Sequence, residues 1–272
     1  MARLLALVAL AAVTAGCRES MEGHFIYYPS RTLAADPSSV GLAFREVSFT
    51  AADGVRLHGW LIPGRTPTTL LYSHGNGGNI AGRLTIARLL ADQLGVGVFM
   101  YDYRGYGRSE GAPSEAGLVS DALGARAALL REGVAAEHVV YYGRSLGAAV
   151  TLDLALALPP RGVVLESPFA SVRAMGNTVL PGAGYLFRTR WDSLAKIPSL
   201  RAPLLVLHGD ADETIPYAQG RALFAAAPEP KTFFTIRGAR HYDMDARWSE
   251  YWAAWRGFLA GLPAPAPARA AR

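Results

Sequence analysis

The chain has 272 residues and a mass of 29.0 kDa, a length that one α/β domain can fill. Its apolar fraction of 51% excludes an intrinsically disordered chain, which lacks the apolar surface needed to offset chain entropy. The net charge of +5 comes from arginines spread singly, without a basic run, so we expect no nucleic-acid partner. The single cysteine, Cys17, excludes an internal disulfide and cannot build a zinc site by itself.

The first residues have the pattern of an export signal. Arg3 precedes an apolar run over 4–13 and then small residues, so 1–16 is predicted to be a signal peptide. That run is too short to span a bilayer. Residues 13–17, Val-Thr-Ala-Gly-Cys, resemble a bacterial lipobox. The resemblance implies that Cys17 is lipidated and that the protein is an exported, membrane-anchored bacterial lipoprotein, in the periplasm or at the cell surface. The alternative is an ordinary signal peptide that leaves a free thiol.

The rest of the chain predicts one domain with an α/β fold. We expect 17–43 to be an N-terminal spacer whose aromatic patch at 25–29 docks on the body. Two alternating runs at 44–50 and 55–62 flank Asp53-Gly54, which predicts a β-hairpin. Strands are predicted at 70–73, 96–101, 138–142, 162–165, 203–207 and 232–236. Helices are predicted at 79–94, 115–132, 146–158, 216–227 and about 244–261. This alternation predicts a mostly parallel central sheet flanked by helices, formed by 44–262, with 263–272 as a flexible tail.

Residues 172–202 interrupt the alternation of strands and helices. Their position after a strand predicts a short cap insertion at the carboxyl end of the sheet, where ligands bind in such folds. Apolar cap residues can either line an acyl pocket or pack the cap onto the body: Val172, Met175, Val179, Leu180, Leu186, Phe187 and Trp191. Three cap arginines, Arg173, Arg188 and Arg190, suggest a preference for anionic lipid headgroups.

A nucleophile is indicated by Gly143-Arg144-Ser145-Leu146-Gly147, which matches G-x-S-x-G. The string lies between a predicted strand and a predicted helix, the setting of a nucleophile elbow. Small residues on both sides leave room for the sharp turn, and the helix N-terminus faces developing negative charge. The alternative is a glycine-rich turn in which Ser145 is a plain N-cap.

A serine needs a general base, and the elbow pattern expects an acid and then a histidine later in the chain. His241 follows the predicted strand 232–236, and the order Ser145, Asp212, His241 is the expected one. Spacing does not select the acid among four carboxyl groups: Asp210, Asp212, Glu213 and Glu166. The other histidines are weaker candidates, because His74 and His208 sit before glycines at strand ends and the rest lie in linker or strand.

An oxyanion hole is expected beside the serine. One donor is the backbone N–H of Leu146, the residue after the nucleophile. The other should come from the loop at 74–78, His-Gly-Asn-Gly-Gly, where glycines permit close approach of a substrate. A phosphate-cradling loop is a weak alternative, because the G-x-x-x-x-G-K-[ST] string is absent.

These motifs together resemble the α/β-hydrolase superfamily, and most closely its Bem46-like branch. The resembling strings lie at 73–79, 101–109, 143–147 and 208–216, in the family's order. The resemblance implies that Asp212 is the catalytic acid, His241 the base and Asn76 the first oxyanion donor. It also implies a serine hydrolase of carboxylic esters, with a small-molecule or lipid ester as substrate and neither a cofactor nor a metal.

Two other functions remain open at this point. A serine peptidase would share the triad but should carry a subsite for a charged peptide terminus, and no such motif is visible. A non-catalytic binding protein on the same fold would usually lose a triad residue, whereas all three are present. A dehalogenase or an epoxide hydrolase would carry Asp at the position of Ser145. The substrate, its acyl length and the oligomeric state are not indicated.

Overall fold

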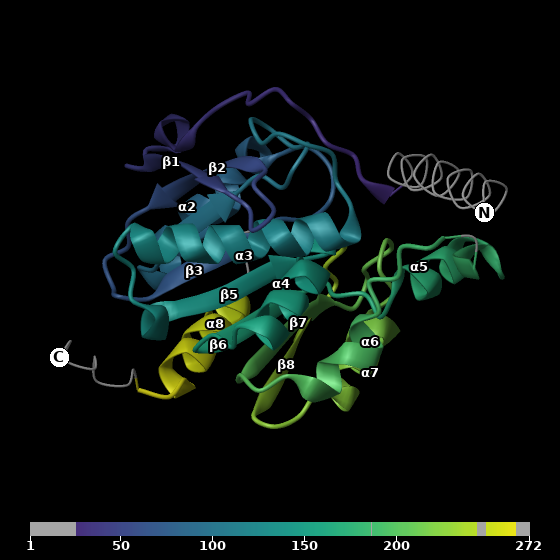
Figure 1. Cartoon of the computed structure of the whole chain (residues 1–272). Helices are drawn as coiled ribbons and strands as arrows, with labels where there is room; N and C mark the ends of the chain where they lie inside the picture. Colours follow the sequence, from purple (N-terminus) through teal and green to yellow (C-terminus); the bar gives the residue numbers. More distant parts are fainter. Residues whose placement is uncertain (1–25, 186, 244–248, 265–272) are drawn as a thin grey trace, which may run out of the picture.

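The structure is a computed structural model that describes residues 26–185, 187–243 and 249–264 (Figure 1). Its centre is an eight-stranded sheet in the order β1-β2-β4-β3-β5-β6-β7-β8. The strands are β1 (Arg45–Thr50), β2 (Arg56–Ile62), β3 (Thr69–Ser73), β4 (Gly97–Tyr101), β5 (Val139–Arg144), β6 (Gly162–Glu166), β7 (Leu204–Gly209) and β8 (Lys231–Ile236). Only β2 is antiparallel to its neighbours β1 and β4, and the other pairs are parallel. The predicted hairpin and mostly parallel sheet are therefore confirmed.

Helices cover both faces of this sheet, as predicted (Figure 1). They are α2 (Leu84–Leu94), α3 (Glu115–Arg131), α4 (Leu146–Ala157), α5 (Val172–Val179), α6 (Ser193–Lys196), α7 (Tyr217–Ala226) and α8 (Ser249–Gly261). Residues of α3, α4 and α7 share one apolar cluster, and residues of α2 and α8 share another. The sheet lies between these two clusters.

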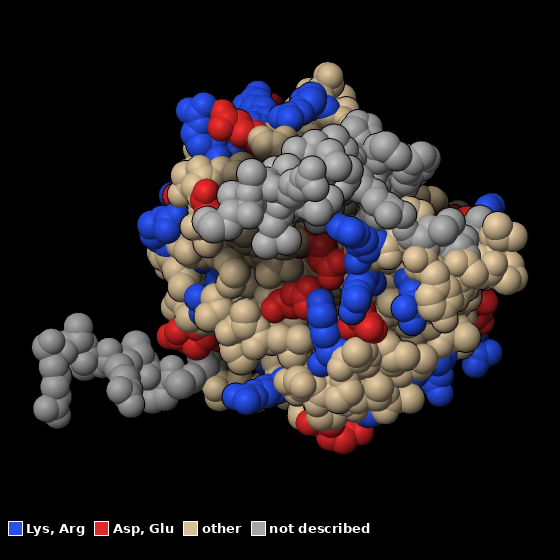
Figure 2. Space-filling model, turned by 45° about the vertical axis from the view of Figure 1, so that its right-hand side comes forward, with Lys and Arg blue, Asp and Glu red and all other residues tan. Residues whose placement is uncertain are grey.

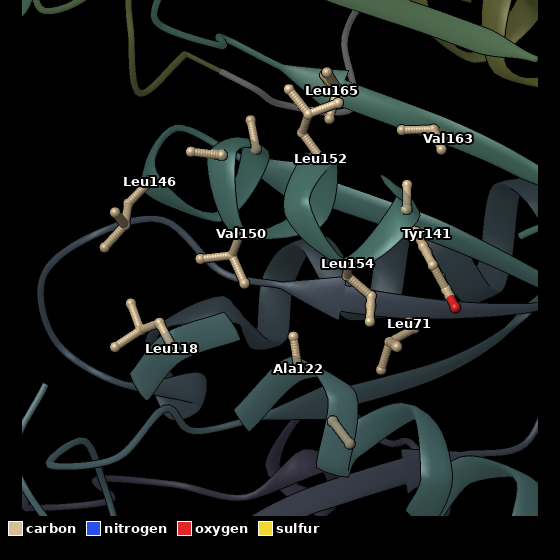
Figure 3. Packing of buried hydrophobic residues seen from close by; sticks show 14 of the residues in the cluster. Leu71, Leu118, Ala122, Tyr141, Leu146, Val150, Leu152, Leu154, Val163 and Leu165 are labelled. Carbon is tan, nitrogen blue, oxygen red and sulfur yellow. The ribbon is translucent and has the colours of Figure 1, made fainter. Parts of the chain in front are cut away.

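Alternation along the buried strands assigns side chains to the two clusters. In β3, Leu71 belongs to the α3–α4 side, whereas Leu70 and Tyr72 belong to the α2–α8 side. Tyr141 and Tyr142 of β5 divide in the same way. Figure 3 shows side chains of α4 packing between α3 and the strands β5 and β6. The strands are buried on both faces, and their carboxyl ends carry the candidate site.

The segment 26–43, expected to be part of a spacer, lies against the body. Tyr27 is buried, and the backbone of Tyr28 pairs with that of Gly78, the last glycine of the loop after β3. Pro29 forms a β-bridge with the same glycine, so the described part of the aromatic patch, 26–29, docks as expected. Residues 1–16 and Cys17 lie outside the described residues.

The predicted insertion contains short helices instead of one crossover helix. It holds α5, two 3-10 turns (Ala183–Tyr185 and Ile197–Ser199) and α6. Trp191 fastens it to the body, since its ring nitrogen donates to the Tyr27 hydroxyl at 3.1 Å. Its backbone N–H donates to Glu115 of α3 at 3.0 Å. The cap is thus attached both to the N-terminal segment and to α3.

On the face in Figure 2, basic and acidic side chains are interspersed. Over the described ranges, we find no helix with the length and apolar character needed to cross a bilayer. The predicted tail begins beyond Leu262, which is buried against the α2–α8 cluster, and 265–272 lie outside the described residues.

Candidate active site

The loop between β5 and α4 has the strained geometry of a nucleophile elbow. Ser145 has φ of 54° and ψ of −119°, a conformation that a residue with a side chain rarely adopts. A Cβ added to Gly147 would lie 1.9 Å from the Ser73 carbonyl oxygen, and one added to Gly143 would lie 2.2 Å from the Gly147 carbonyl oxygen. Only glycine fits at these two positions, because the turn brings neighbouring backbones into contact. Ser145 is thereby held at the start of α4, facing a pocket.

The loops after β7 and β8 bring an acid and a histidine together. The ring Nδ1 of His241 lies 2.8 Å from Oδ2 of Asp212. The other oxygen of Asp212 accepts the backbone N–H groups of Thr214 (3.0 Å) and Ile215 (2.7 Å), which fixes the carboxylate. With Nδ1–H donating to Asp212, Nε2 of His241 keeps the lone pair that a general base needs.

The environment of Asp212 keeps its carboxylate ionised. Burial raises the pKa of Asp212, but hydrogen bonds from His208, His241 and the Ile215 backbone outweigh burial. The net effect holds the pKa of Asp212 well below its ordinary value of 3.8. A negative charge beside His241 stabilises a protonated imidazole, as a general base requires.

The three competing carboxylates have other partners. Asp210 accepts the backbone N–H of Gly238 at 2.6 Å. Glu213 is exposed, and it accepts the backbone N–H of His241 and a guanidinium N–H of Arg240. Neither contacts the imidazole ring. Of the acids that spacing left open, only Asp212 is hydrogen-bonded to the ring of His241.

Glu166, the fourth candidate, ends β6 and is fully buried. One of its oxygens accepts the hydroxyls of Tyr142 and Tyr251, each at 2.8 Å. Its other oxygen lies 3.1 Å from Nε of Arg144, the residue before Ser145. Arg144 also donates to the backbone carbonyl of His241. In the described structure, Glu166 is therefore linked to the backbone of His241 through Arg144.

The loop after β3 lies beside the serine. A Cβ on Gly75 would be 3.5 Å from the Ser145 Cβ. The side-chain oxygen of Asn76 accepts the backbone N–H of Tyr28 (3.1 Å) and the hydroxyl of Tyr106 (2.9 Å). Its amide nitrogen donates to the carbonyl of Ile26. Since the side chain of Asn76 is held in this way, its backbone is fixed next to Ser145.

Arg83 also holds the loop after β3, through the backbone carbonyls of that loop. Its Nη2 donates to the carbonyls of Gly75 (3.3 Å), Asn76 (3.2 Å) and Gly77 (2.8 Å). These hydrogen bonds orient the three carbonyl groups toward Arg83. Neither Arg83 nor Arg144 was predicted to act at the site, because a lone arginine beside a motif has no pattern that distinguishes it.

The pocket in front of Ser145 has a volume of about 720 Å³. Its wall includes Ser145, Leu146, Asn76 and His241, so the predicted nucleophile, base and oxyanion donors face one space. Four of the predicted cap residues also line it: Val172, Met175, Phe187 and Trp191. Leu180 is 63% exposed and points elsewhere. The side chain of Val179 and all of Leu186 lie outside the described residues. Among the described lining residues there is no aspartate or glutamate.

A row of buried ionisable groups runs behind the oxyanion loop. Nε2 of His74 lies 4.0 Å from one oxygen of Asp102, and Nδ1 of His58 lies 3.8 Å from the other. Burial lowers the pKa of His74 to about 4, although the charge of Asp102 acts to raise it. His74 is therefore neutral at pH 7, and its Nδ1 lies 2.8 Å from the carbonyl oxygen of Gly75 in the same loop. In the described ranges, no cluster of three or more His, Cys, Asp or Glu side chains is arranged to hold a metal ion.

Comparison with known proteins agrees with this architecture. The model of a family described as serine aminopeptidase, S33, matches residues 65–195, which include Ser145 but not Asp212 or His241. Protein YfhR of Escherichia coli (strain K12) is 37% identical over 232 residues, which cover 81% of this chain and 80% of YfhR. Protein bem46 of Schizosaccharomyces pombe is 34% identical over 228 residues, covering 79% of this chain and 76% of bem46.

Among solved structures, the esterase Pf2001 of Pyrococcus furiosus is similar with a TM-score of 0.73. The match covers 87% of this chain and 98% of the esterase, at 19% sequence identity. At this level of identity the likeness shows that the two chains share a fold.

Proposed function

This chain belongs to the Bem46-like branch of the α/β-hydrolase superfamily, and on that premise we propose that it is a serine hydrolase of carboxylic esters. One observation carries the proposal. His241 is bonded through Nδ1 to Asp212 at 2.8 Å, and it lines the same pocket as the strained Ser145. This combination of acid, base and exposed nucleophile suits acyl transfer.

The reaction we propose has two steps. Nε2 of His241 takes the hydroxyl proton of Ser145 as Oγ attacks the ester carbonyl carbon. The backbone N–H groups of Leu146 and Asn76 stabilise the oxyanion, and Asp212 stabilises the imidazolium. The C–O bond to the alcohol then breaks, and His241 protonates the departing alkoxide. Water, deprotonated by His241, attacks the acyl-enzyme and releases the acid and free Ser145.

The composition of the pocket favours an acyl or lipid ester. Phe169, Val172, Met175 and Phe187 form an apolar wall that suits an acyl chain. The matched family is described as a serine aminopeptidase. An aminopeptidase would have to bind the ammonium group of a peptide N-terminus. A carboxylate is the usual partner for that group, and none lines the described part of the pocket. We therefore prefer an esterase to a peptidase.

The test is hydrolysis of p-nitrophenyl esters from C2 to C16 by the wild-type protein and by Ser145→Ala. We expect serine-dependent turnover that Ser145→Ala lowers by about 10⁶-fold in kcat. A loss of less than about tenfold would remove Ser145 from the mechanism. Turnover of peptides but not of esters would favour the peptidase instead.

A membrane anchor would add to this function. We propose that Cys17 is lipidated, which makes the protein an exported bacterial lipoprotein. Ile26 lines the pocket, and only nine residue steps separate it from Cys17, a reach of at most roughly 30 Å. The pocket would then stay close to the bilayer that supplies lipid esters. Cys17→Ser should move the protein from the membrane fraction to the soluble fraction, and unchanged membrane association would contradict the anchor.

A further inference from the structure

The charged groups around the pocket are not balanced. Arg83 and Arg144 line it, whereas no described lining residue is acidic. Arg144 is neutralised by Glu166 at 3.1 Å. Within 26–185, 187–243 and 249–264, no carboxylate forms an ion pair with Arg83. One side of the pocket therefore carries a positive charge that the described protein does not offset.

The contacts of Arg83 leave part of its guanidinium available. All three of its hydrogen bonds to the oxyanion loop come from one nitrogen, Nη2. A guanidinium has five N–H donors, and among the described residues those of Nη1 and Nε have no hydrogen-bond acceptor, so they are available to a ligand. Pairs of such donors match the oxygens of a phosphate or a carboxylate.

The sheet order sets Arg83 and the apolar wall on opposite sides of the serine. β5, which leads to Ser145, lies between β3 and β6. The loop that Arg83 contacts follows β3, and the cap with Val172 and Phe187 follows β6. A Cβ on Gly75 would be 3.5 Å from the Ser145 Cβ, and the Gly75 carbonyl is 3.3 Å from Nη2 of Arg83. Nη2 of Arg83 is thus within roughly 10 Å of the Ser145 Cβ, given ordinary backbone dimensions.

We propose that Arg83 binds an anionic group, phosphate or carboxylate, on the alcohol part of the substrate. The acyl chain then lies along the cap, and the ester carbonyl lies at Ser145. The substrate class is an amphiphilic ester with an apolar acyl chain and a charged alcohol. This inference rests on the proposed esterase function and adds to it the chemistry of the leaving group.

A purely structural role for Arg83 makes a different prediction. If the arginine only holds the loop at Gly75, Asn76 and Gly77, its removal slows every ester by the same factor. If it binds the leaving group, its removal slows anionic esters more. The informative quantity is therefore the ratio of kcat/KM for an anionic ester to that for its neutral partner.

The experiment uses two matched pairs of octanoyl esters with the full chain. One pair is 1-octanoylglycerol and 1-octanoylglycerol 3-phosphate, and the other is ethyl octanoate and O-octanoylglycolate. We expect wild type to prefer the anionic member of at least one pair. Arg83→Gln should lower the anionic-to-neutral ratio by about tenfold to a hundredfold, the size of a hydrogen bond to a charged group. Arg83→Lys should retain part of the preference because it keeps the charge, and Arg131→Gln, at an exposed position on α3, is the matched control.

The outcomes separate the possible ligands. A preference in the glycerol pair alone identifies phosphate, and one in the glycolate pair alone identifies carboxylate. An equal fall of both members in Arg83→Gln, or no preference in wild type, would overturn the inference while leaving the esterase intact.

A binding measurement keeps the inference testable if no ester is hydrolysed. Octyl phosphate is titrated calorimetrically into Ser145→Ala and into the double variant Ser145→Ala/Arg83→Gln, with octyl glucoside as the neutral probe. Binding that weakens at least tenfold on loss of Arg83 supports the anion site even where the proposed esterase function fails. Equal binding of octyl phosphate to both variants would contradict the site.

Discussion

The end of β6 and the loop after β7 each place a buried carboxylate near the pocket, and the two carboxylates have different partners. The strands are neighbours, with Glu166 in register with Leu207. Glu166 is enclosed by Arg144 and two tyrosine hydroxyls, so its charge is permanently paired. Asp212 instead contacts the ring of His241, whose charge can change during a reaction.

The difference shows that position at a strand end does not by itself assign a catalytic acid. Both carboxylates sit where ligands bind in parallel sheets. Their roles follow from the groups that the neighbouring loops bring to them. In the proposed mechanism Asp212 orients and stabilises the base, whereas Glu166 is a structural group that holds Arg144 and, through it, the loop of His241.

Of the two carboxylates, Asp212 is expected to have the larger effect, and that effect is on kcat. Asp212→Asn should lower kcat by about 10⁴-fold, because a neutral amide can hold the wrong imidazole tautomer and cannot stabilise the imidazolium. Asp210→Asn should lower kcat by less than tenfold, since Asp210 accepts only a backbone N–H from Gly238 in the described structure. Both values come from steady-state ester hydrolysis. Equal losses in the two variants would contradict the assignment of the acid.

Replacing Glu166 is expected to affect the stability of the fold. Glu166→Gln leaves the buried guanidinium of Arg144 without its counter-ion and should lower the free energy of unfolding by about 3–5 kcal/mol. Urea denaturation measures this change. A double variant, Glu166→Gln/Arg144→Met, removes both charges and should recover part of the lost stability. A loss below about 1 kcal/mol for Glu166→Gln would mean that the pair is not buried as described.

A third buried group, His74, should make the stability of the protein depend on pH. The pKa of His74 is lowered from 6.5 to about 4 in the folded protein, mainly by burial. The unfolded chain has the higher pKa and therefore binds the proton more tightly. The contribution of neutral His74 to stability is therefore complete above pH 6.5 and is lost as the pH drops toward 4. Between pH 7 and pH 4.5, wild type should lose about 2–3 kcal/mol more than His74→Gln. Parallel pH dependences in urea denaturation would show that His74 does not titrate in this way.

The cap side of the pocket should give the smallest effect. Phe187 is half-buried on the apolar wall, so Phe187→Ala should lower kcat/KM for a C8 ester by about tenfold relative to acetate. Leu180→Ala, on the same cap but 63% exposed, should change this ratio less than twofold. A chain-length series measures both. An equal change for C2 and C8 esters in Phe187→Ala would place the acyl chain elsewhere.

Local patterns in the sequence predicted much of the fold. Alternating and continuous apolar runs marked the strands, and the G-x-S-x-G string between a strand and a helix located the elbow at Ser145. The order of motifs pointed to His241 and to a set of acids. Asp212 was selected by the family resemblance, because the four carboxyl groups differ only in contacts that spacing does not encode.

The remaining features depend on contacts between distant residues. The strand order is set by pairing across the sheet, which periodicity within a strand does not determine. Asn76 was predicted for its backbone, yet its side chain joins Ile26 and Tyr28, about fifty residues away. Docking of the aromatic patch around Tyr27 was predicted, but its partner was not: the Tyr27 hydroxyl accepts a hydrogen bond from Trp191 of the cap, more than 160 residues away.

We propose that Ser145 is the nucleophile and that His241 and Asp212 activate it. The most direct measurement is mass-spectrometric mapping of the residue modified by a fluorophosphonate, in wild type, Ser145→Ala and His241→Ala. We expect one adduct, on the peptide that contains Ser145, absent in Ser145→Ala and formed much more slowly in His241→Ala. An adduct on another residue, or equal labelling of wild type and Ser145→Ala, would contradict the account.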